Sequence, residues 1–396
     1  MKLIKQKQNC SGCSACASIC PNHCITMKED KEGFLYPFID DTQCINCGKC
    51  KSRCPVFQQR KVQRKPKAFA AYSKHDSVRE ASSSGGLFTE LAQQVLQSGG
   101  AVFGASFDDC FHVVHTYVQN TQDLNKLRGS KYVQSSIGDA YAETEALLKE
   151  GRKVYFSGTP CQISGLKTYL EKDYENLVCQ DLICHGTPSP KVWRNYVRFR
   201  EDTAQSSAHK ISFRNKTQGW QKFSLLFQFI NGTEYRQTLD CDSYLHLFLS
   251  NVCLRPSCSN CAFKGLDRQS DITLADFWGV NQMMPSMFDD KGTSLVIVNT
   301  DKGKKLFDSI SDSVIVKPVD FNQAIQYNPA IGQSVEASPK RESFFTDLEK
   351  EPFEEVLKKY GSDSFSTKIK RKTKGAIKQT LSSLGMLDKV KQWVHR

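Results

Sequence analysis

Two runs of cysteine near the N-terminus share one spacing and could bind iron–sulfur clusters. Cys10 to Pro21 reads C-x-x-C-x-x-C-x-x-x-C-P, and Cys44 to Pro55 repeats it without a change of spacing. In proteins with two such runs, three close cysteines bind one iron–sulfur cube and the fourth cysteine of the run binds the other. The duplication therefore predicts two [4Fe–4S] clusters. We expect the first on Cys10, Cys13, Cys16 and Cys54, and the second on Cys44, Cys47, Cys50 and Cys20.

This spacing is typical of a bacterial-type ferredoxin module, which passes single electrons. A pair of zinc knuckles is the alternative, but zinc sites usually combine two close cysteines with a distant second pair. Cys24 fits no position in either run, and we expect it to be a buried thiol. An electron-carrying module needs a redox partner at each end, so the rest of the chain should supply one of them.

Four further cysteines predict a third [4Fe–4S] cluster. Cys161 follows an expected strand at 153–157, and Cys184 follows another at 177–183. Ligands of open α/β sheets bind beyond the carboxyl ends of the strands, so both cysteines should emerge at one sheet edge. Cys258 and Cys261 form a C-x-x-C pair that would complete the set, with Cys253 as a substitute ligand. A structural zinc ion or free thiols remain open alternatives.

A serine- and glycine-rich segment precedes a predicted helix and could bind phosphate. Ser82 to Gly86 leads into residues 87–96, whose apolar positions follow helical spacing. The free amides and positive dipole of a helix N-terminus suit a phosphate, and glycine allows close approach to the backbone. Ordinary helix capping explains the same residues equally well.

Composition limits the class of protein. The chain has 396 residues, 17 of them cysteine, and a formal net charge of +12. It has no apolar run near the length needed to span a bilayer and no secretory signal pattern at Met1, so we expect a cytoplasmic protein with cluster-binding cysteines rather than disulfides. The charge alone would allow a nucleic-acid binder, but bound clusters and flavin phosphate would offset it. We therefore expect no nucleic-acid partner.

The alternation of strand-like and helix-like segments predicts a mixed α+β and α/β fold, with a small ferredoxin-type module followed by a larger mixed α/β body. Strands are expected at 101–107 and 113–118, and a helix at 139–149. The predicted divisions are a ferredoxin-type domain at 1–58, a basic linker at 59–68, the two parts of the body at 69–150 and 151–330, and a C-terminal region at 331–396 with a basic amphipathic tail. The tail could rest on anionic lipid, dock on a partner or be a solvated helix, with at most peripheral membrane contact.

Several motifs in the body occur together in one known family. They are Ser-Ser-Gly-Gly at 83–86, Leu127 to Tyr132, Gly-Thr-Pro-Cys-Gln at 158–162, Cys-His-Gly at 184–186, and Asp271 to Gly279. In this order they resemble the family of beta subunits of coenzyme F420 hydrogenases and dehydrogenases, whose relatives include 7-hydroxymethyl chlorophyll a reductase. The resemblance spans about Phe69 to Pro329 and implies bound FAD, so that the larger body would be a mixed α/β flavin-binding body. The positions that it implies for flavin contact are Ser84, Gly85, Gly86, Lys131, Tyr132 and Thr159.

The expected function follows from this combination. Clusters move single electrons and most organic reductions need a pair, which a flavin can supply. We therefore expect an FAD-dependent iron–sulfur oxidoreductase with an unknown small-molecule substrate, or alternatively a non-catalytic electron-transfer subunit of a larger redox complex. Use of the deazaflavin coenzyme F420 stays open, and the electron donor would be ferredoxin or a redox-complex subunit. No residue is assigned as catalytic, because His185 is better explained as hydrogen-bonding support, and Asp271 and Asp276 as capping or turn residues.

Overall fold

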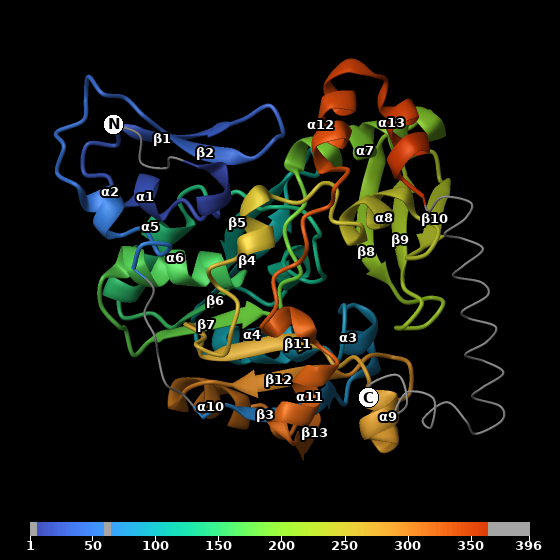
Figure 1. Ribbon diagram of the computed structural model, residues 1–396. Helices are drawn as coiled ribbons and strands as arrows, with labels where there is room; N and C mark the ends of the chain where they lie inside the picture. The colour runs from blue at the N-terminus through green and yellow to red at the C-terminus, as the bar shows by residue number, and fades with distance from the viewer. Residues whose placement is uncertain (1–5, 59–64, 363–396) are drawn as a thin grey trace, which may run out of the picture.

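The computed structural model describes residues 6–58 and 65–362 and contains three β-sheets. A two-stranded sheet belongs to the N-terminal module, an eight-stranded sheet forms the centre of the body, and a three-stranded sheet packs with helices beside it. Figure 1 shows the module and the three-stranded sheet on opposite sides above the large sheet. The predicted ferredoxin-type module and mixed α/β body are both present.

The module repeats its conformation as well as its sequence. Strands β1 (Ile25–Glu29) and β2 (Leu35–Ile39) pair antiparallel between the two cysteine runs. Each run continues into one short helix, α1 (Ala15–Ser18) or α2 (Lys49–Ser52). Gly12 and Ser14 have φ of 70° and 64°, and the equivalent Asn46 and Gly48 have φ of 53° and 73°. The same left-handed turns therefore wrap the backbone around both groups of cysteines, although their residue types differ.

The eight-stranded sheet has the strand order β13-β3-β12-β11-β7-β6-β4-β5. Its strands are β3 (Lys67–Ser73), β4 (Ala101–Phe107), β5 (Val113–Val118), β6 (Val154–Ser157), β7 (Leu177–Leu182), β11 (Ile272–Asp276), β12 (Ser294–Val298) and β13 (Val314–Val319). The strands β4, β6, β7 and β11 are mutually parallel, and β3 runs the same way because it is antiparallel to β12, which is antiparallel to β11. Five strands therefore end at one edge of the sheet.

Helices cover both faces of this sheet, as expected for strands that are apolar on both sides. Tyr155 and Val102 point to the face packed by α4 (Leu87–Gln97) and α10 (Asp301–Asp308). Phe103 and Phe156 point to the face packed by α5 (Ala140–Lys149) and α6 (Pro160–Leu170). The remaining helices of this part are α3 (Asp76–Glu80), η2 (Asp123–Lys126), α9 (Val280–Met283), η4 (Pro285–Met287), α11 (Phe321–Gln326) and η5 (Pro329–Ile331). The strands and helices expected from the sequence between residues 87 and 183 agree with the structure to within one residue at each end.

Aromatic side chains form the core of the third unit, which the sequence analysis did not identify. Its strands are β8 (Ala208–Asn215), β9 (Ser224–Phe229) and β10 (Glu234–Thr238), and its helices are α7 (Pro190–Ala204), α8 (Ser243–Leu249), α12 (Arg341–Lys350) and α13 (Phe353–Tyr360). Trp193 is 1% exposed and packs against Phe213 and Tyr244 at ring-centroid distances of 4.7 and 4.9 Å. This unit supplies part of the surface that holds the module.

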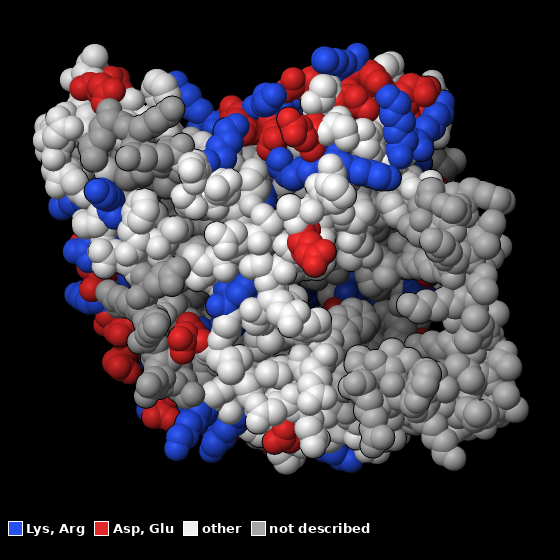
Figure 2. All heavy atoms as spheres, in the orientation of Figure 1, with Lys and Arg blue, Asp and Glu red and all other residues white. Residues whose placement is uncertain are grey.

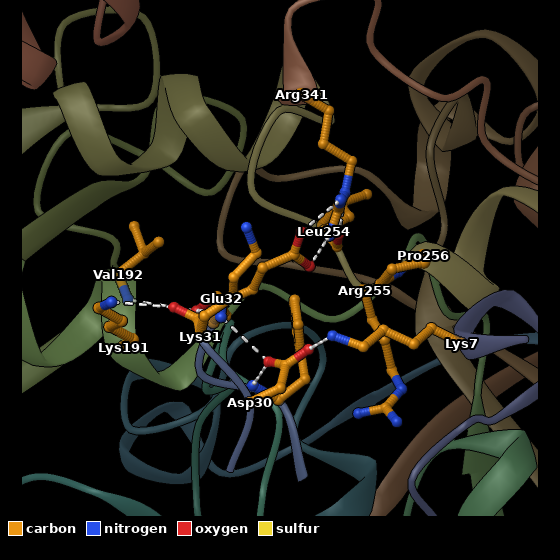
Figure 3. Close-up of polar contacts among 12 residues, drawn as sticks. Lys7, Asp30, Lys31, Glu32, Lys191, Val192, Leu254, Arg255, Pro256 and Arg341 are labelled. Carbon is orange, nitrogen blue, oxygen red and sulfur yellow. Dashed lines mark hydrogen bonds and ion pairs between the residues drawn. The ribbon is translucent and has the colours of Figure 1, made fainter. Parts of the chain in front are cut away.

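The module is attached to the body by polar contacts and by close backbone packing. Arg341 donates two hydrogen bonds to the Glu32 carboxylate, at 3.1 and 2.6 Å, and a third to the carbonyl of Leu254 at 2.9 Å. Lys191 donates to the carbonyl of Lys31 at 2.9 Å. Figure 3 shows these contacts converging on the turn between β1 and β2. In addition, η1 (Lys7–Asn9) of the module lies against η3 (Pro256–Asn260) of the body.

No helix in the described parts of the chain has the length and apolar character to cross a membrane. The expected amphipathic tail over 381–394 and most of the basic linker, at residues 59–64, lie outside the described residues.

We predict that Gly165→Ala destabilises the packing of α6 against the module. A Cβ at Gly165 would lie 2.7 Å from the hydroxyl of Tyr141 and 3.1 Å from Cβ of Cys13. The steric cost of about 1–3 kcal/mol exceeds the gain of about 0.5–1 kcal/mol from alanine in a helix. Urea denaturation followed by circular dichroism should show a lower free energy of unfolding. Gly104→Ala is the control, because the nearest atom to its Cβ would be at 3.6 Å; equal stability of the two variants would contradict the prediction.

Candidate functional site

The first four cysteines come together as predicted, on the side of the module that faces the body. Cys13 and Cys16 each lie within electrostatic reach of Cys10 and Cys54, and burial together with these neighbouring thiols raises the pKa of both. Cys10, Cys13 and Cys54 are each 8% exposed. We name these four residues the inner set: Cys10, Cys13, Cys16 and Cys54.

The other four cysteines of the module form a second group nearer the surface. Burial, followed by the charges of Cys20, Cys47 and Cys44, raises the pKa of Cys50. The same four residues line one cavity, and Cys47 is exposed. Cys54 of the inner set is within electrostatic reach of Cys50. We name Cys20, Cys44, Cys47 and Cys50 the outer set, which adjoins the inner set through Cys54.

Cys161, Cys184, Cys258 and Cys261 also come together, and we name them the third set. They line one cavity of about 290 Å³ between the module and the body. Cys161 follows β6 and Cys184 follows β7, so both lie at the sheet edge where the parallel strands end. Cys161 is within electrostatic reach of Cys261 and Cys184, and also of Cys13 in the inner set. The third set is therefore next to the inner set.

Two other cysteines, Cys253 and Cys24, belong to none of the three sets. Cys253 is fully buried in the aromatic core and does not line the cavity. Cys24 is 5% exposed, as expected for a buried thiol, but its sulfur lies 3.3 Å from that of Cys20 and it lines the cavity of the outer set.

The chemistry of the three sets fits iron–sulfur clusters. Thiols whose pKa is raised by burial and by mutual repulsion need a bound cation before they can remain thiolates together. Backbone N–H groups also reach the sulfurs, from Ala15 to Cys13 and from Phe263 to Cys261. Such N–H groups are the usual outer contacts of cluster sulfurs. In the described parts of the chain, no three His, Cys, Asp or Glu side chains are grouped closely enough to hold a single metal ion.

Two cations that no sequence motif marks, Lys264 and Arg268, border the third set. Lys264 donates to the carbonyls of Cys184 and Ala330. Arg268 pairs with the buried carboxylate of Asp181 at 3.1 Å and also lines the cavity. A cluster with four thiolates carries net negative charge, so these cations suit it.

The loops implied in flavin binding also meet at this sheet edge. The backbone N–H of Ser130 donates to the hydroxyl of Ser83 at 2.7 Å, which joins the loop at 82–86 to the loop at 127–132. Arg214 on β8 donates to the carbonyl of Ser83 and to the hydroxyl of Tyr132, at 3.0 and 3.1 Å. It also pairs with Asp276 at the end of β11, at 2.7 Å. Arg214 thus connects three of the motifs that carried the family resemblance, and no sequence motif marked it.

Internal contacts account for part of the serine–glycine loop. A Cβ at Gly85 would lie 2.6 Å from the carbonyl of Ala71, so glycine is required there by packing. Ser84 donates to the carbonyl of Thr293 at 3.1 Å. Gly86 is the N-cap of α4 and has φ of 90°. Thr159 forms a capping box with Gln162 and lies 3.1 Å from the sulfur of Cys161. The backbone N–H groups of Gly85 and Thr159 also have internal acceptors, namely the side chains of Ser294 at 3.0 Å and Gln162 at 2.9 Å.

The surroundings of Lys131 test whether an anionic cofactor fits at this sheet edge. Burial lowers the pKa of its ammonium group to about 7. Its hydrogen bonds go to the carbonyls of Arg128 and Gly129, at 3.0 and 3.3 Å, and none to a carboxylate among the described residues. Figure 2 shows a hollow below the three-stranded sheet with Lys or Arg atoms visible inside it. The cations at this edge, Lys131 and Arg214 among them, fit the diphosphate of FAD.

The contacts of His185, Asp271 and Trp220 are mostly structural. His185 lines the cavity, and its imidazole contacts the Asn251 side chain at 2.7 Å. Asp271 accepts hydrogen bonds from the backbone of Cys179 and the hydroxyl of Thr300, at 2.8 and 2.6 Å. Trp220 is fully buried and stacks on Trp278 at 5.0 Å. The contacts of His185 and Asp271 agree with the supporting roles expected for them, and Trp220 belongs to the core.

Comparison with known protein families identifies the family of this chain. Residues 68–141 match the model of the N-terminal part of the coenzyme F420 hydrogenase/dehydrogenase beta subunit, and residues 151–323 match that of its C-terminal part. Residues 9–57 match a 4Fe-4S dicluster domain. The chain belongs to the family of coenzyme F420 hydrogenase/dehydrogenase beta subunits. This beta-subunit relative is thus an iron–sulfur protein related to oxidoreductases.

Two curated relatives and one solved structure resemble this family member. It is 26% identical over 321 residues to the coenzyme F420-dependent sulfite reductase of Methanocaldococcus jannaschii, covering 76% of this chain and 46% of that protein. It is 23% identical over 207 residues to one subunit of the F420H2 dehydrogenase of Methanosarcina mazei, covering 48% of this chain and 58% of that protein. A chain of the F420-reducing [NiFe] hydrogenase complex of Methanosarcina barkeri aligns with a TM-score of 0.45 and 18% identity, over 70% of this chain and 97% of that one. This chain spans about half the length of the two curated relatives.

The third cluster expected from the sequence can be tested at Cys258: if the third set binds a four-iron cube, Cys258→Ala removes one of its ligands and should lower the iron content by about four atoms per chain. Cys253→Ala is the matched control: it removes a thiol five residues away that does not line the cavity, so it should keep the wild-type iron content. Both are measured by iron and sulfide analysis of anaerobically purified protein. Equal iron in the two variants, or zinc in the wild-type protein in place of the third cube, would contradict the assignment.

Proposed function

We propose that this protein is an FAD-dependent iron–sulfur oxidoreductase that exchanges electrons between a one-electron protein partner and an organic substrate. Bound clusters would supply one-electron exchange, and FAD would supply the conversion between single electrons and pairs. One observation carries the proposal, namely the continuity of the three cysteine sets. Cys54 adjoins Cys50, and Cys161 adjoins Cys13, so the series runs from the module surface to the sheet edge.

In this proposal each group of residues has a defined task. The outer, inner and third sets each hold one [4Fe–4S] cluster through four thiolates. Lys131 binds the anionic part of the flavin, and Arg214 orients Tyr132 and Asp276 beside it. Ser84, Gly85, Gly86 and Thr159 are further candidates for flavin contact, Gly86 through its backbone N–H group, since the N–H of Gly85 already donates to the hydroxyl of Ser294.

The protein partner would dock at the outer set, where Cys47 is exposed and the neighbouring Ile45 is 61% exposed. A ferredoxin or one component of a redox complex has the required one-electron chemistry. Coenzyme F420 is the first substrate to test, because both curated relatives are named for reactions with it. The thiolate-rich sets would be maintained in a reducing compartment such as the cytoplasm.

A non-catalytic electron-transfer subunit is the second candidate function. It is favoured by the relative from Methanosarcina mazei, which is named as part of a dehydrogenase with several subunits. Turnover of coenzyme F420 or another substrate by the isolated chain would exclude this candidate, whereas co-purification with a larger redox enzyme and no turnover alone would favour it.

We predict that protein purified without oxygen contains about twelve irons and one FAD per chain, as three four-iron cubes and one flavin require. Iron, sulfide and acid-released flavin are measured against protein. About eight irons without flavin would leave only the dicluster module and would refute the flavoenzyme.

The Lys131→Gln variant tests the flavin assignment more directly. Loss of a charged hydrogen bond of about 1.5–3 kcal/mol should weaken FAD binding about tenfold or more. A bound anion raises the pKa of Lys131 from about 7, so affinity for added FAD should fall as pH rises above 7, and the variant should lose this dependence. Burial lowers the pKa of the neighbouring His115 to about 4, so it stays neutral in this range. Lys126→Gln, which removes an exposed lysine paired with Asp123, is the control; equal FAD affinity in the two variants would count against a flavin at Lys131.

A further inference from the structure

Arg255 links the third set to the inner set, although neither its position nor its residue type belongs to a cluster motif. Its backbone lies in the loop that carries Cys258: the N–H donates to the carbonyl of Thr187 at 3.0 Å, and its carbonyl accepts from the N–H of Cys258 at 2.9 Å. Its side chain leaves this loop and enters the ferredoxin module. Figure 3 shows it emerging between Leu254 and Pro256, next to the Arg341 contact with the module.

The guanidinium of Arg255 donates four hydrogen bonds to acceptors in the module and the body. Nε donates to the carbonyl of Cys10 at 2.7 Å, and Nη2 donates to the carbonyl of Leu35 at 2.9 Å and to the sulfur of Cys10 at 3.6 Å. Nη1 donates to the side chain of Gln134 at 2.9 Å. The guanidinium also lies 4.2 Å from the ring centroid of Tyr36. The side chain therefore has one fixed position, beside a ligand of the inner set.

This buried positive charge has no carboxylate partner among the described residues. Arg255 is 1% exposed, and every acceptor of its hydrogen bonds is a carbonyl, an amide or a sulfur. The acidic side chains of the nearby hairpin pair with other cations, Glu32 with Arg341 and Asp30 with Lys7. Burying an arginine is costly unless a negative charge compensates it. The group that can supply this charge is the one bound by Cys10 and its three partners.

The two halves of the duplicated module differ at this point. A Cβ at Gly12, where φ is 70°, would lie 2.6 Å from Nε2 of Gln134 and 2.8 Å from Nη1 of Arg255, so glycine in the first run leaves room for both side chains. The equivalent residue of the second run is Asn46, which is exposed. In the described parts of the chain, no arginine or lysine donates to a sulfur of the outer set. The inner set thus has a buried cation and the outer set has none at the matching place.

We infer that Arg255 is a positioning residue that compensates the charge of the inner-set cluster and raises its reduction potential relative to that of the outer-set cluster. The inference rests on the cluster assignment in the proposed function. Reduction adds one electron from an external donor and no proton, so the oxidised and reduced forms differ by one negative charge. The arginine stays protonated in both forms, and its N–H to the Cys10 sulfur favours the more negative one. Electrons entering at the outer set would then be drawn inward.

The test compares Arg255→Gln with Arg341→Gln in the full chain carrying its clusters. Both variants remove a cation from the contact between module and body, but only Arg255 reaches a ligand sulfur. The potentials are measured by redox titration with dithionite followed by electron paramagnetic resonance. The outer cluster is identified from the Cys47→Ser variant, whose changed ligand alters its spectrum.

We expect Arg255→Gln to shift the electron equilibrium between inner and outer clusters at least tenfold toward the outer one, which is 59 mV for one electron. Arg341→Gln should leave that equilibrium unchanged. An unchanged potential in Arg255→Gln, or equal shifts in both variants, would overturn the inference. If Arg255→Gln fails to assemble the inner cluster, Arg255→Lys decides: it keeps the charge, so a wild-type potential supports the inference and a tenfold shift overturns it. Absence of the two clusters from the wild-type protein would instead be a failure of the proposed function.

Discussion

The close contact between the ferredoxin module and the body is the constraint on which the other features of this protein depend. Single electrons pass efficiently only between centres that are near one another and fixed, so a module held by a flexible linker would not serve. Here Gly165 lets α6 approach Cys13, and Gly12 lets Arg255 approach Cys10. A Cβ at Gly165 would lie 3.1 Å from that of Cys13, and one at Gly12 would lie 2.8 Å from Nη1 of Arg255, so both glycines leave room for the contact. The packing that stabilises the module also brings Cys13 of the inner set beside Cys161 of the third set.

The sheet edge supplies the second half of the arrangement. Five parallel strands end there, and their following loops bring cysteines, glycines and cations from distant parts of the chain into one region. Cations that are partly or fully removed from water are costly and are favoured where a negative group offsets them. Arg214 is offset by Asp276, whereas Lys131 and Arg255 have no such partner among the described residues. Lys131 and Arg255 therefore lie where the proposed flavin and the inner-set cluster would supply negative charge.

The sequence allowed the cysteine sets to be predicted, because cluster ligands follow fixed local spacing in the module and loops after strands in the body. The grouping of Cys161 with Cys184 followed from the alternation of strands and helices, and Cys258 with Cys261 from their own spacing. Arg214 and Arg255 could not be found in this way. A single arginine carries no motif, and its burial and partners arise from tertiary packing between segments far apart in the chain. The three-stranded sheet was also missed, since β10 is mostly polar and has no clear apolar alternation.

The most direct test of the continuous series is the magnetic interaction between neighbouring clusters in the fully reduced protein. We expect an electron paramagnetic resonance spectrum that is broadened by spin coupling of the inner cluster to both neighbours. Removing the third cluster by Cys258→Ala should abolish one of these couplings and leave that between inner and outer clusters. A wild-type spectrum equal to the sum of isolated cluster signals would contradict the account, because the three cysteine sets would then not form one electron path.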